Sequence, residues 1–279
     1  MNGAAHPVPV ISGTTRLLGI VGDPIAQVGS PRAFNARLAA AGADAVLVPF
    51  HVPAAAFEPT MRGLMSLRNL DGLLVTIPFK ERALALADTV LPVAAQVGAA
   101  NVLRREADGR WTADMFDGVG LLRALAGLGL AAEGASVLLI GAGGAGRAIA
   151  ISLARAGAAR IGIHDLDSAR ASALAARVRA AYPDCAAAEA VPRAEGYGIV
   201  INATPAGMAP GDGLPAPLGT LDGLAGVIDF VTRPAVTPLL AAAAAAGCPN
   251  AGGQAVVEGQ AAAVLDFFRI LPAGSPPGS

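Results

Sequence analysis

Short apolar runs alternate with amphipathic stretches along two successive parts of the chain. The first part predicts strands and intervening helices, with strands at 17–21, 45–48 and 72–77 and helices at 31–41, 54–67 and 80–87. The second part repeats the pattern, with strands at 137–140, 160–164, 198–202 and 226–230 and helices at 147–155, 168–181, 239–246 and 256–268. Between the two parts, residues 101–105 and 111–113 favour a hairpin, and residues 117–128 favour a helix.

Strands separated by helices form parallel sheets, because the helix carries the chain back to the end of the sheet at which the previous strand began. Two such series predict an α/β protein of two domains with a cleft between them. Ligands of such sheets bind beyond the carboxyl ends of the strands. The ends of the chain, residues 1–15 and 272–279, are rich in small residues and proline, and we expect them to be disordered.

Composition excludes several classes of function. The chain has 279 residues and a formal net charge of −1, with no basic block, so nucleic acid is not an expected partner. The mean hydropathy of +0.55 comes largely from alanine, and no apolar run approaches the ~18 residues of a membrane span. We see no signal peptide, and the few cysteines and histidines lack metal-ligand spacing, so we expect a cytoplasmic protein without a metal.

A glycine-rich turn follows the strand predicted at 137–140. Gly141, Gly143 and Gly146 fit G-x-G-x-x-G between a strand and a helix, the setting in which that pattern binds a dinucleotide. The first glycine permits the tight turn, the second lets a pyrophosphate approach the backbone, and the third lets helix and strand pack closely. The whole turn, with Ala142, Gly144 and Ala145, is therefore a candidate cofactor site at a helix N-terminus.

Asp165 ends the next predicted strand, roughly 20 residues further on, where an acidic group meets the adenosine ribose. Its carboxylate would accept hydrogen bonds from a free 2′,3′-diol and repel a 2′-phosphate. Arg170 follows five positions later and could soften this preference. We expect NAD to be favoured, with NADP possible.

Three further segments place polar residues at predicted strand ends. Lys80 follows a proline turn, and it is either a proton-transfer group or a solvated lysine at the start of a helix. Asp117 either caps the helix at 117–128 or orients Lys80. The segment with Asn202 and Thr204 is either a simple turn or the nicotinamide side of the cofactor site.

Several segments together resemble the shikimate dehydrogenase family, which includes quinate and aminoshikimate dehydrogenases. The resemblance runs from about residue 19 to 268 and rests on segments 22–31, 75–80, 98–101, 117–121, the glycine turn, 201–204 and 259–262. It implies an N-terminal substrate-binding domain over 1–116 with a mainly parallel sheet, completed by the helix at 256–270. It also implies a Rossmann-type NAD(P)-binding domain over 117–255.

The same resemblance assigns roles to individual residues. Lys80 and Asp117 look like the catalytic pair that moves a proton while hydride passes between substrate and nicotinamide. Substrate contacts are implied for Ser30, Thr76, Asn101, Thr232 and Gln260, and cofactor contacts for Phe230 and Gly253. The implied activity is NAD(P)-dependent oxidation of a ring hydroxyl of shikimate, quinate or a related hydroxylated cyclic acid.

Some positions depart from the family pattern, and the changes make the contacts around the substrate ring and its carboxylate less polar. Val28 replaces the first serine of the family's Ser-x-Ser loop, and Leu74 replaces an asparagine. Thr232 and Phe230 replace a tyrosine and a methionine, and residues 115–116 replace Asn-Thr. A hydrogen bond to a charged group is worth about 1.5–3 kcal/mol, and this chain lacks some of the donors that bind the substrate carboxylate in the family. We therefore expect poor turnover of shikimate itself.

Two other functions stay open. A dinucleotide or metabolite sensor on the same fold would explain the lost substrate contacts, and a folate-linked methylene dehydrogenase fits the segments around Asn101 and Asp117 less well. We expect a small-molecule substrate and a monomer or homodimer.

Overall fold

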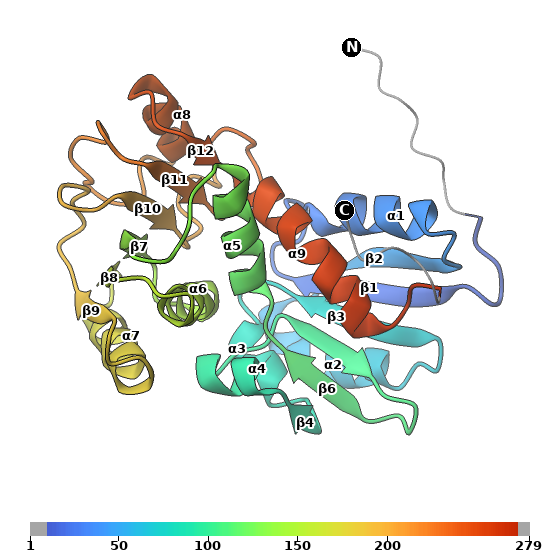
Figure 1. The fold of residues 1–279 in the computed structure, drawn as a ribbon. Coiled ribbons are helices and arrows are strands. Elements are labelled where there is room, and N and C mark those ends of the chain that lie inside the picture. Colours follow the sequence, from blue (N-terminus) through green and yellow to red (C-terminus); the bar gives the residue numbers. More distant parts are fainter. Residues whose placement is uncertain (1–9, 273–279) are drawn as a thin grey trace, which may run out of the picture.

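The computed structural model describes residues 10–272. Its chain forms two sheets, each covered by helices, and we call these units the N-terminal and C-terminal lobes (Figure 1). The prediction of two α/β units is therefore confirmed. The stretches 1–9 and 273–279, for which we expected disorder, lie outside the described residues.

The N-terminal sheet has the strand order β2-β1-β3-β5-β6-β4. Its strands are β1 (Arg16–Gly22), β2 (Ala45–His51), β3 (Leu70–Val75), β4 (Thr89–Val90), β5 (Val102–Arg105) and β6 (Trp111–Asp114). Strands β2, β1 and β3 are parallel, whereas β5 and β6 form the predicted hairpin and run antiparallel to β3 and to each other. The helices of this lobe are α1 (Ser30–Ala40), the 3₁₀ turn η1 (Ala54–Ala56), α2 (Phe57–Met65), α3 (Lys80–Leu84) and α4 (Pro92–Val97).

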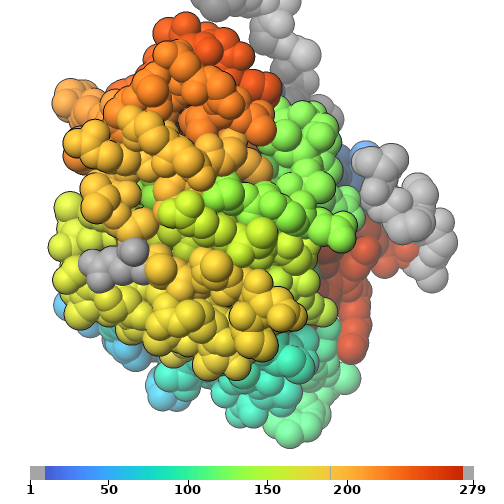
Figure 2. Space-filling model, turned by 60° about the vertical axis from the view of Figure 1, so that its left-hand side comes forward, coloured from blue at the N-terminus to red at the C-terminus, as the bar shows by residue number. Residues whose placement is uncertain are grey.

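The C-terminal sheet is parallel throughout, with the order β12-β11-β10-β7-β8-β9. Its strands are β7 (Ser136–Ile140), β8 (Arg160–His164), β9 (Ala186–Glu189), β10 (Ile199–Asn202), β11 (Gly226–Asp229) and β12 (Asn250–Ala251). The helices after the hairpin are α5 (Asp117–Gly127), α6 (Gly144–Arg155), α7 (Ser168–Ala181), α8 (Pro238–Ala245) and α9 (Gly253–Phe268). Figure 2 shows the outer face of this lobe, with α7 in yellow and teal residues of the N-terminal lobe at its lower edge.

Helices α5 and α9 lie side by side between the two sheets (Figure 1). A Cβ at Gly120 of α5 would lie only 2.5 Å from the carbonyl oxygen of Val256, so the two helices approach closely at this glycine. Val256 belongs to the core of the C-terminal lobe, whereas the rest of the buried face of α9, including Val264 and Phe268, packs in the core of the N-terminal lobe with Phe34 of α1. We propose on this basis that 1–116 with 256–270 form one domain and 117–255 the other.

Several predicted boundaries were wrong. The third strand ends at Val75, before residues 76 and 77, because the chain turns there toward Pro78. Helix α3 stops at Leu84 rather than 87, and α9 begins at Gly253 rather than 256. The elements α4, β4, β9 and β12 were missed, since they are short and β9 begins with three alanines that carry no strand signal.

Candidate functional site

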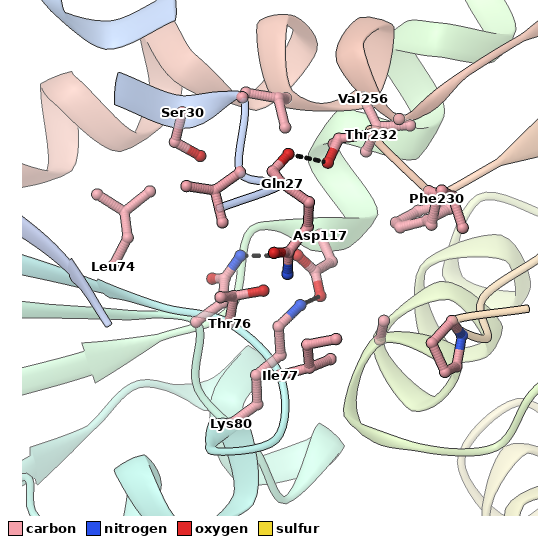
Figure 3. Close-up of a pocket in the computed structure, with 18 of the residues that line it drawn as sticks. Gln27, Ser30, Leu74, Thr76, Ile77, Lys80, Asp117, Phe230, Thr232 and Val256 are labelled. Atoms are coloured by element: carbon pink, nitrogen blue, oxygen red, sulfur yellow. Dashed lines mark hydrogen bonds and ion pairs between the residues drawn. The ribbon is translucent and has the colours of Figure 1, made fainter. Parts of the chain in front are cut away.

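A pocket lies between the lobes, beyond the carboxyl ends of β1 and β3 on one side and of β10 and β11 on the other. Its N-terminal wall contains Val28, Ser30, Leu74, Thr76, Lys80 and Asn101, and its C-terminal wall contains Ala145, Thr204, Phe230, Thr232 and Gly253. Asp117 of α5 (Figure 3) and Gln260 of α9 also line it. The predicted cleft therefore holds most of the predicted site residues.

Lys80 and Asp117 meet in this pocket. Lys80 is the first residue of α3 and Asp117 the first residue of α5, and the Lys80 ammonium donates to Asp117 Oδ2 at 2.5 Å. The exposed fractions of the two side chains are 13% and 6%. Water therefore screens the pair weakly, and the carboxylate fixes the direction in which the lysine points.

Asp117 is itself held by a buried amide. Asn101 follows α4 and donates from Nδ2 to Asp117 Oδ1 at 2.8 Å and to Gln260 Oε1 at 3.2 Å. Its own Oδ1 accepts the backbone N–H of Phe116 at 2.8 Å. Asn101 thus orients the carboxylate in addition to lining the pocket, a role that the sequence did not indicate.

The opposite end of the N-terminal wall is largely apolar. Ser30 and Leu74 are each 4% exposed, and Figure 3 shows both on one side of the pocket with Phe230 on the other. Thr76 lies between this end and Lys80. The Thr232 hydroxyl donates to the backbone oxygen of Gln27 at 2.7 Å, which links the two lobes across the pocket.

The glycine turn lies beside Lys80. Gly141 has φ +103°, and a Cβ at Gly146 would lie 1.9 Å from the Gly141 carbonyl oxygen, so both positions require glycine. A Cβ at Gly143 would meet no atom within 4 Å, which leaves room above the turn at the start of α6. A Cβ at Gly144 would lie 3.1 Å from the Lys80 Cβ. The turn thus has the open space and free helix N-terminus that a pyrophosphate requires.

Asp165 lies next to this turn. Its Oδ2 accepts the N–H of Ala142 at 2.7 Å, and its Oδ1 accepts the N–H of Asp167 at 2.9 Å. Arg170 is 63% exposed and pairs with Asp167 at 3.6 Å. The carboxylate therefore holds a fixed position between the glycine turn and the start of α7, where an adenosine ribose would lie in this fold.

Asn202 does not reach the pocket surface. It is fully buried, donates to Asp229 Oδ1 at 2.9 Å, and accepts the N–H and hydroxyl of Thr204 at 3.0 and 2.7 Å. Burial raises the pKa of Asp229, while the Thr237 hydroxyl, the Val231 N–H and the Asn202 amide counteract this rise. Asn202 thus shapes the turn from below, and Thr204 presents that turn to the pocket.

One ion pair between the lobes was not predicted. Arg147, in the first turns of α6, pairs with Glu81, the neighbour of Lys80 in α3. Either residue alone has the sequence signature of an exposed helical charge, so only the fold could reveal the pairing. No helix within residues 10–272 is long and apolar enough to span a membrane. In the same part of the chain, no cluster of three or more His, Cys, Asp or Glu residues could hold a metal.

Comparisons with known proteins agree with this geometry. Residues 20–103 match the family model described as the shikimate dehydrogenase substrate binding domain. A curated relative, shikimate dehydrogenase (NADP(+)) of Caulobacter vibrioides, is 42% identical over 257 residues, which cover 90% of this chain and 88% of the relative.

Solved structures share the whole fold. Shikimate 5-dehydrogenase of Listeria monocytogenes, in complex with shikimate and NAD, superposes with a TM-score of 0.78 and 30% identity over 94% of this chain and 93% of that one. The ligand-free 5-ketofructose reductase of Gluconobacter sp. strain CHM43 gives a TM-score of 0.79 and 28% identity over 92% of this chain and 95% of that one. The chain belongs to the shikimate dehydrogenase family.

Proposed function

We propose that this protein is an NAD(P)-dependent oxidoreductase of the shikimate dehydrogenase type. It would interconvert a secondary hydroxyl and a ketone of shikimate, quinate or a related hydroxylated compound. The overall reaction converts the alcohol and NAD(P)⁺ into the ketone, NAD(P)H and a proton. The observation that carries the proposal is the buried Lys80–Asp117 pair, which faces the interlobe pocket beside the glycine turn.

Lys80 is the proton-transfer group in this proposal. When bound, the nicotinamide supplies the hydride acceptor or donor. During oxidation the amine form of Lys80 takes the hydroxyl proton and becomes the ammonium, and during reduction the ammonium returns that proton. Asp117 keeps the lysine directed at the reacting oxygen. Such a positioned acid–base group contributes typically about 10²–10⁴-fold to the rate. Asn101 holds Asp117 and also donates to Gln260, whose own amide hydrogens can bind neighbouring substrate hydroxyls.

The cofactor would lie along the C-terminal lobe, from the glycine turn to Phe230 and Gly253. The relative from Caulobacter is named for NADP⁺ and the Listeria structure contains NAD, so both cofactors occur among the compared proteins. The carboxylate of Asp165, held beside the turn, favours the free diol of NAD. Steady-state kinetics with both cofactors test this, and a higher kcat/KM with NADP would refute it.

The proposal as a whole is tested with Lys80→Ala. We expect kcat for alcohol oxidation to fall by about 10²-fold or more, with the Kd of NAD unchanged, because only the proton acceptor is lost. Lys80→Arg is the matched control: it keeps a cation beside Asp117 but does not accept a proton at neutral pH, so its rate should fall as well. A sensor without enzymatic activity would show no turnover in any variant, and full activity of Lys80→Ala would refute the assignment.

The thiols of Cys185 and Cys248 are both free and buried, which favours a reducing compartment. We therefore propose that the protein acts in the cytoplasm.

A further inference from the structure

The charge balance of the interlobe pocket limits which substrates it can hold. The charged side chains among its described lining residues are Lys80 and Asp117, and these neutralise each other at 2.5 Å. Lys80 is also needed at the reacting oxygen under the proposed function. A substrate carboxylate would therefore enter a pocket without a cation of its own.

The side chains of the pocket wall around Val28 offer few donors for an anion, which leaves the Ser30 hydroxyl and the backbone N–H groups at the start of α1 as donors there. Val28, Ile20, Leu74 and Val257 line it, and Val28 is held in place because it packs on the apolar cluster that contains Phe34 of α1. An ionised carboxylate buried against this wall would keep some of its oxygen lone pairs without a donor, which is costly in a weakly hydrated site.

Two polar side chains near this end are already engaged, Thr232 of the C-terminal wall through its hydroxyl hydrogen and Gln27 through one of its two amide hydrogens. The Thr232 hydroxyl donates its proton to the Gln27 backbone oxygen at 2.7 Å, and the Gln27 side-chain amide donates to the Pro24 oxygen at 2.8 Å. The lone pairs that Thr232 keeps can accept a hydrogen bond but would repel a carboxylate. Ser30, two residues after Val28 in the chain, contributes a side-chain hydroxyl to this end of the pocket, on the same side as Leu74 (Figure 3).

The other polar groups of the pocket suit hydroxyls. Ser30, Thr76 and Gln260 carry hydroxyl or amide groups, each of which can both donate and accept. Asn101, whose two amide hydrogens bind Asp117 and Gln260, can still accept at its oxygen. A substrate hydroxyl has the same dual character, and the C–H faces of a polyol match the apolar surface of Val28 and Leu74.

We infer that the substrate is an uncharged polyhydroxy alcohol or ketone, cyclic or open-chain, that lacks a carboxylate. The reacting carbon lies at Lys80, and an uncharged end of the molecule lies against Val28, Leu74 and Ser30. This inference rests on the proposed function and narrows its substrate class to hydroxylated compounds other than shikimate and quinate, which both carry a carboxylate.

A matched pair of compounds tests the inference on the full chain. Shikimate carries a carboxylate, and methyl shikimate carries an uncharged ester at the same place. With NAD⁺ or NADP⁺, we expect kcat/KM for methyl shikimate to exceed that for shikimate by about 10-fold or more, the factor that one charged hydrogen bond supplies. Reduction of 5-ketofructose by NADH and NADPH provides a second uncharged probe, with measurable turnover expected.

Substitution at Val28 provides the reverse test. Val28→Ser adds a donor beside Ser30, and we expect it to raise the ratio of kcat/KM for shikimate to kcat/KM for methyl shikimate by about 10-fold. Val28→Ala removes the same bulk without adding a hydroxyl and should not improve shikimate. Val28→Thr keeps the shape of valine and repeats the gain if the serine variant folds poorly.

The possible failures can be told apart. Higher kcat/KM for shikimate than for its ester in the unsubstituted protein would overturn the inference and leave the proposed function standing. No turnover of any of the three compounds would overturn the proposed function. In that case, calorimetric binding of the two shikimate compounds in the presence of NAD⁺ decides the inference, and tighter binding of the carboxylate overturns it.

Discussion

Asn101 shows how much of the site depends on single side chains. It is 4% exposed, and its two amide ends hold Asp117, Gln260 and the backbone of Phe116 at the same time. Asp117 in turn holds Lys80. The direction of the lysine is therefore set by an amide that does not touch it.

We expect Asn101→Ala to lower kcat by about 10-fold or more, because a hydrogen bond to an ionised carboxylate is worth about 1.5–3 kcal/mol. The Kd of the cofactor should stay unchanged. Thr76→Val serves as the comparison, since it removes a pocket hydroxyl without disturbing Asp117 and should raise KM more than it lowers kcat. Equal effects of the two variants on kcat would contradict the orienting role of Asn101.

The resemblance of the segments around Lys80 and Asp117 to the shikimate dehydrogenase family predicted that these two side chains act as a pair, and the structure brings them together. The bond from Asn101 to Gln260 joins residues 159 positions apart, so no local pattern could indicate it. Asn202 was predicted to contact the cofactor, but it is fully buried below the turn, because its amide satisfies Asp229 and Thr204.

At the scale of elements, two glycines of the glycine turn differ in their surroundings: one packs tightly and the other borders open space. Gly146 → Ala would place a methyl carbon 1.9 Å from the Gly141 oxygen, whereas Gly143 → Ala meets no atom within 4 Å. Gly146 therefore belongs to the contact between β7 and α6, and Gly143 borders open space, which we propose holds a phosphate of the cofactor.

We expect Gly146→Ala to destabilise the protein by about 1–3 kcal/mol, because the turn and α6 must move apart. Gly143→Ala should change stability by less than about 0.5 kcal/mol and still raise the Kd of NAD. Thermal unfolding without cofactor and fluorescence titration with NADH measure the two effects. Unchanged NADH binding by Gly143→Ala would contradict the proposed position of the pyrophosphate.

The hairpin β5–β6 anchors the C-terminal end of α9 through Glu106. Its carboxylate accepts from Thr112 at 2.6 Å and from Arg104 at 2.5 Å, and Arg104 also donates to the Phe267 oxygen at 2.8 Å. The Thr112 hydroxyl and then Arg104 hold the pKa of Glu106 below its ordinary value.

Because this pKa is lower in the folded state, ionised Glu106 stabilises the fold at pH values above its ordinary pKa of about 4.3, and this contribution is lost as pH falls toward the folded-state pKa. We expect Glu106→Gln to reduce the free energy of unfolding by about 1–3 kcal/mol near pH 6. The difference from the unsubstituted protein should shrink as pH approaches 3. Urea unfolding across this range measures it, and a difference that grows toward low pH would refute the assignment.

For the molecule as a whole, contacts between the lobes complete the pocket. The bond from Thr232 to Gln27, the pair of Arg147 with Glu81, and the shared helix α9 all cross from one lobe to the other. The distance between Lys80 and the cofactor side of the pocket therefore depends on how the lobes are held together.

Thr232→Val keeps the shape of the side chain and removes only the hydroxyl. We expect the free energy of unfolding to fall by about 0.5–1.5 kcal/mol, the worth of one neutral hydrogen bond, and kcat/KM to fall several-fold. Kinetics in the direction of alcohol oxidation measure the second effect. Unaltered kcat/KM would mean that this bond does not help to hold the lobes in their active arrangement.

The sequence by itself determined the two α/β units and the glycine turn, because strand periodicity, turn chemistry and the glycine spacing are local properties of the chain. Its resemblance to the shikimate dehydrogenase family supplied most of the candidate site residues. The tertiary structure alone decided which side chains meet. It joined Asn101 to Gln260 and Arg147 to Glu81, and it placed α9 across both lobes. Such pairings depend on how distant segments pack to bury their apolar faces, and no short stretch of sequence records that choice.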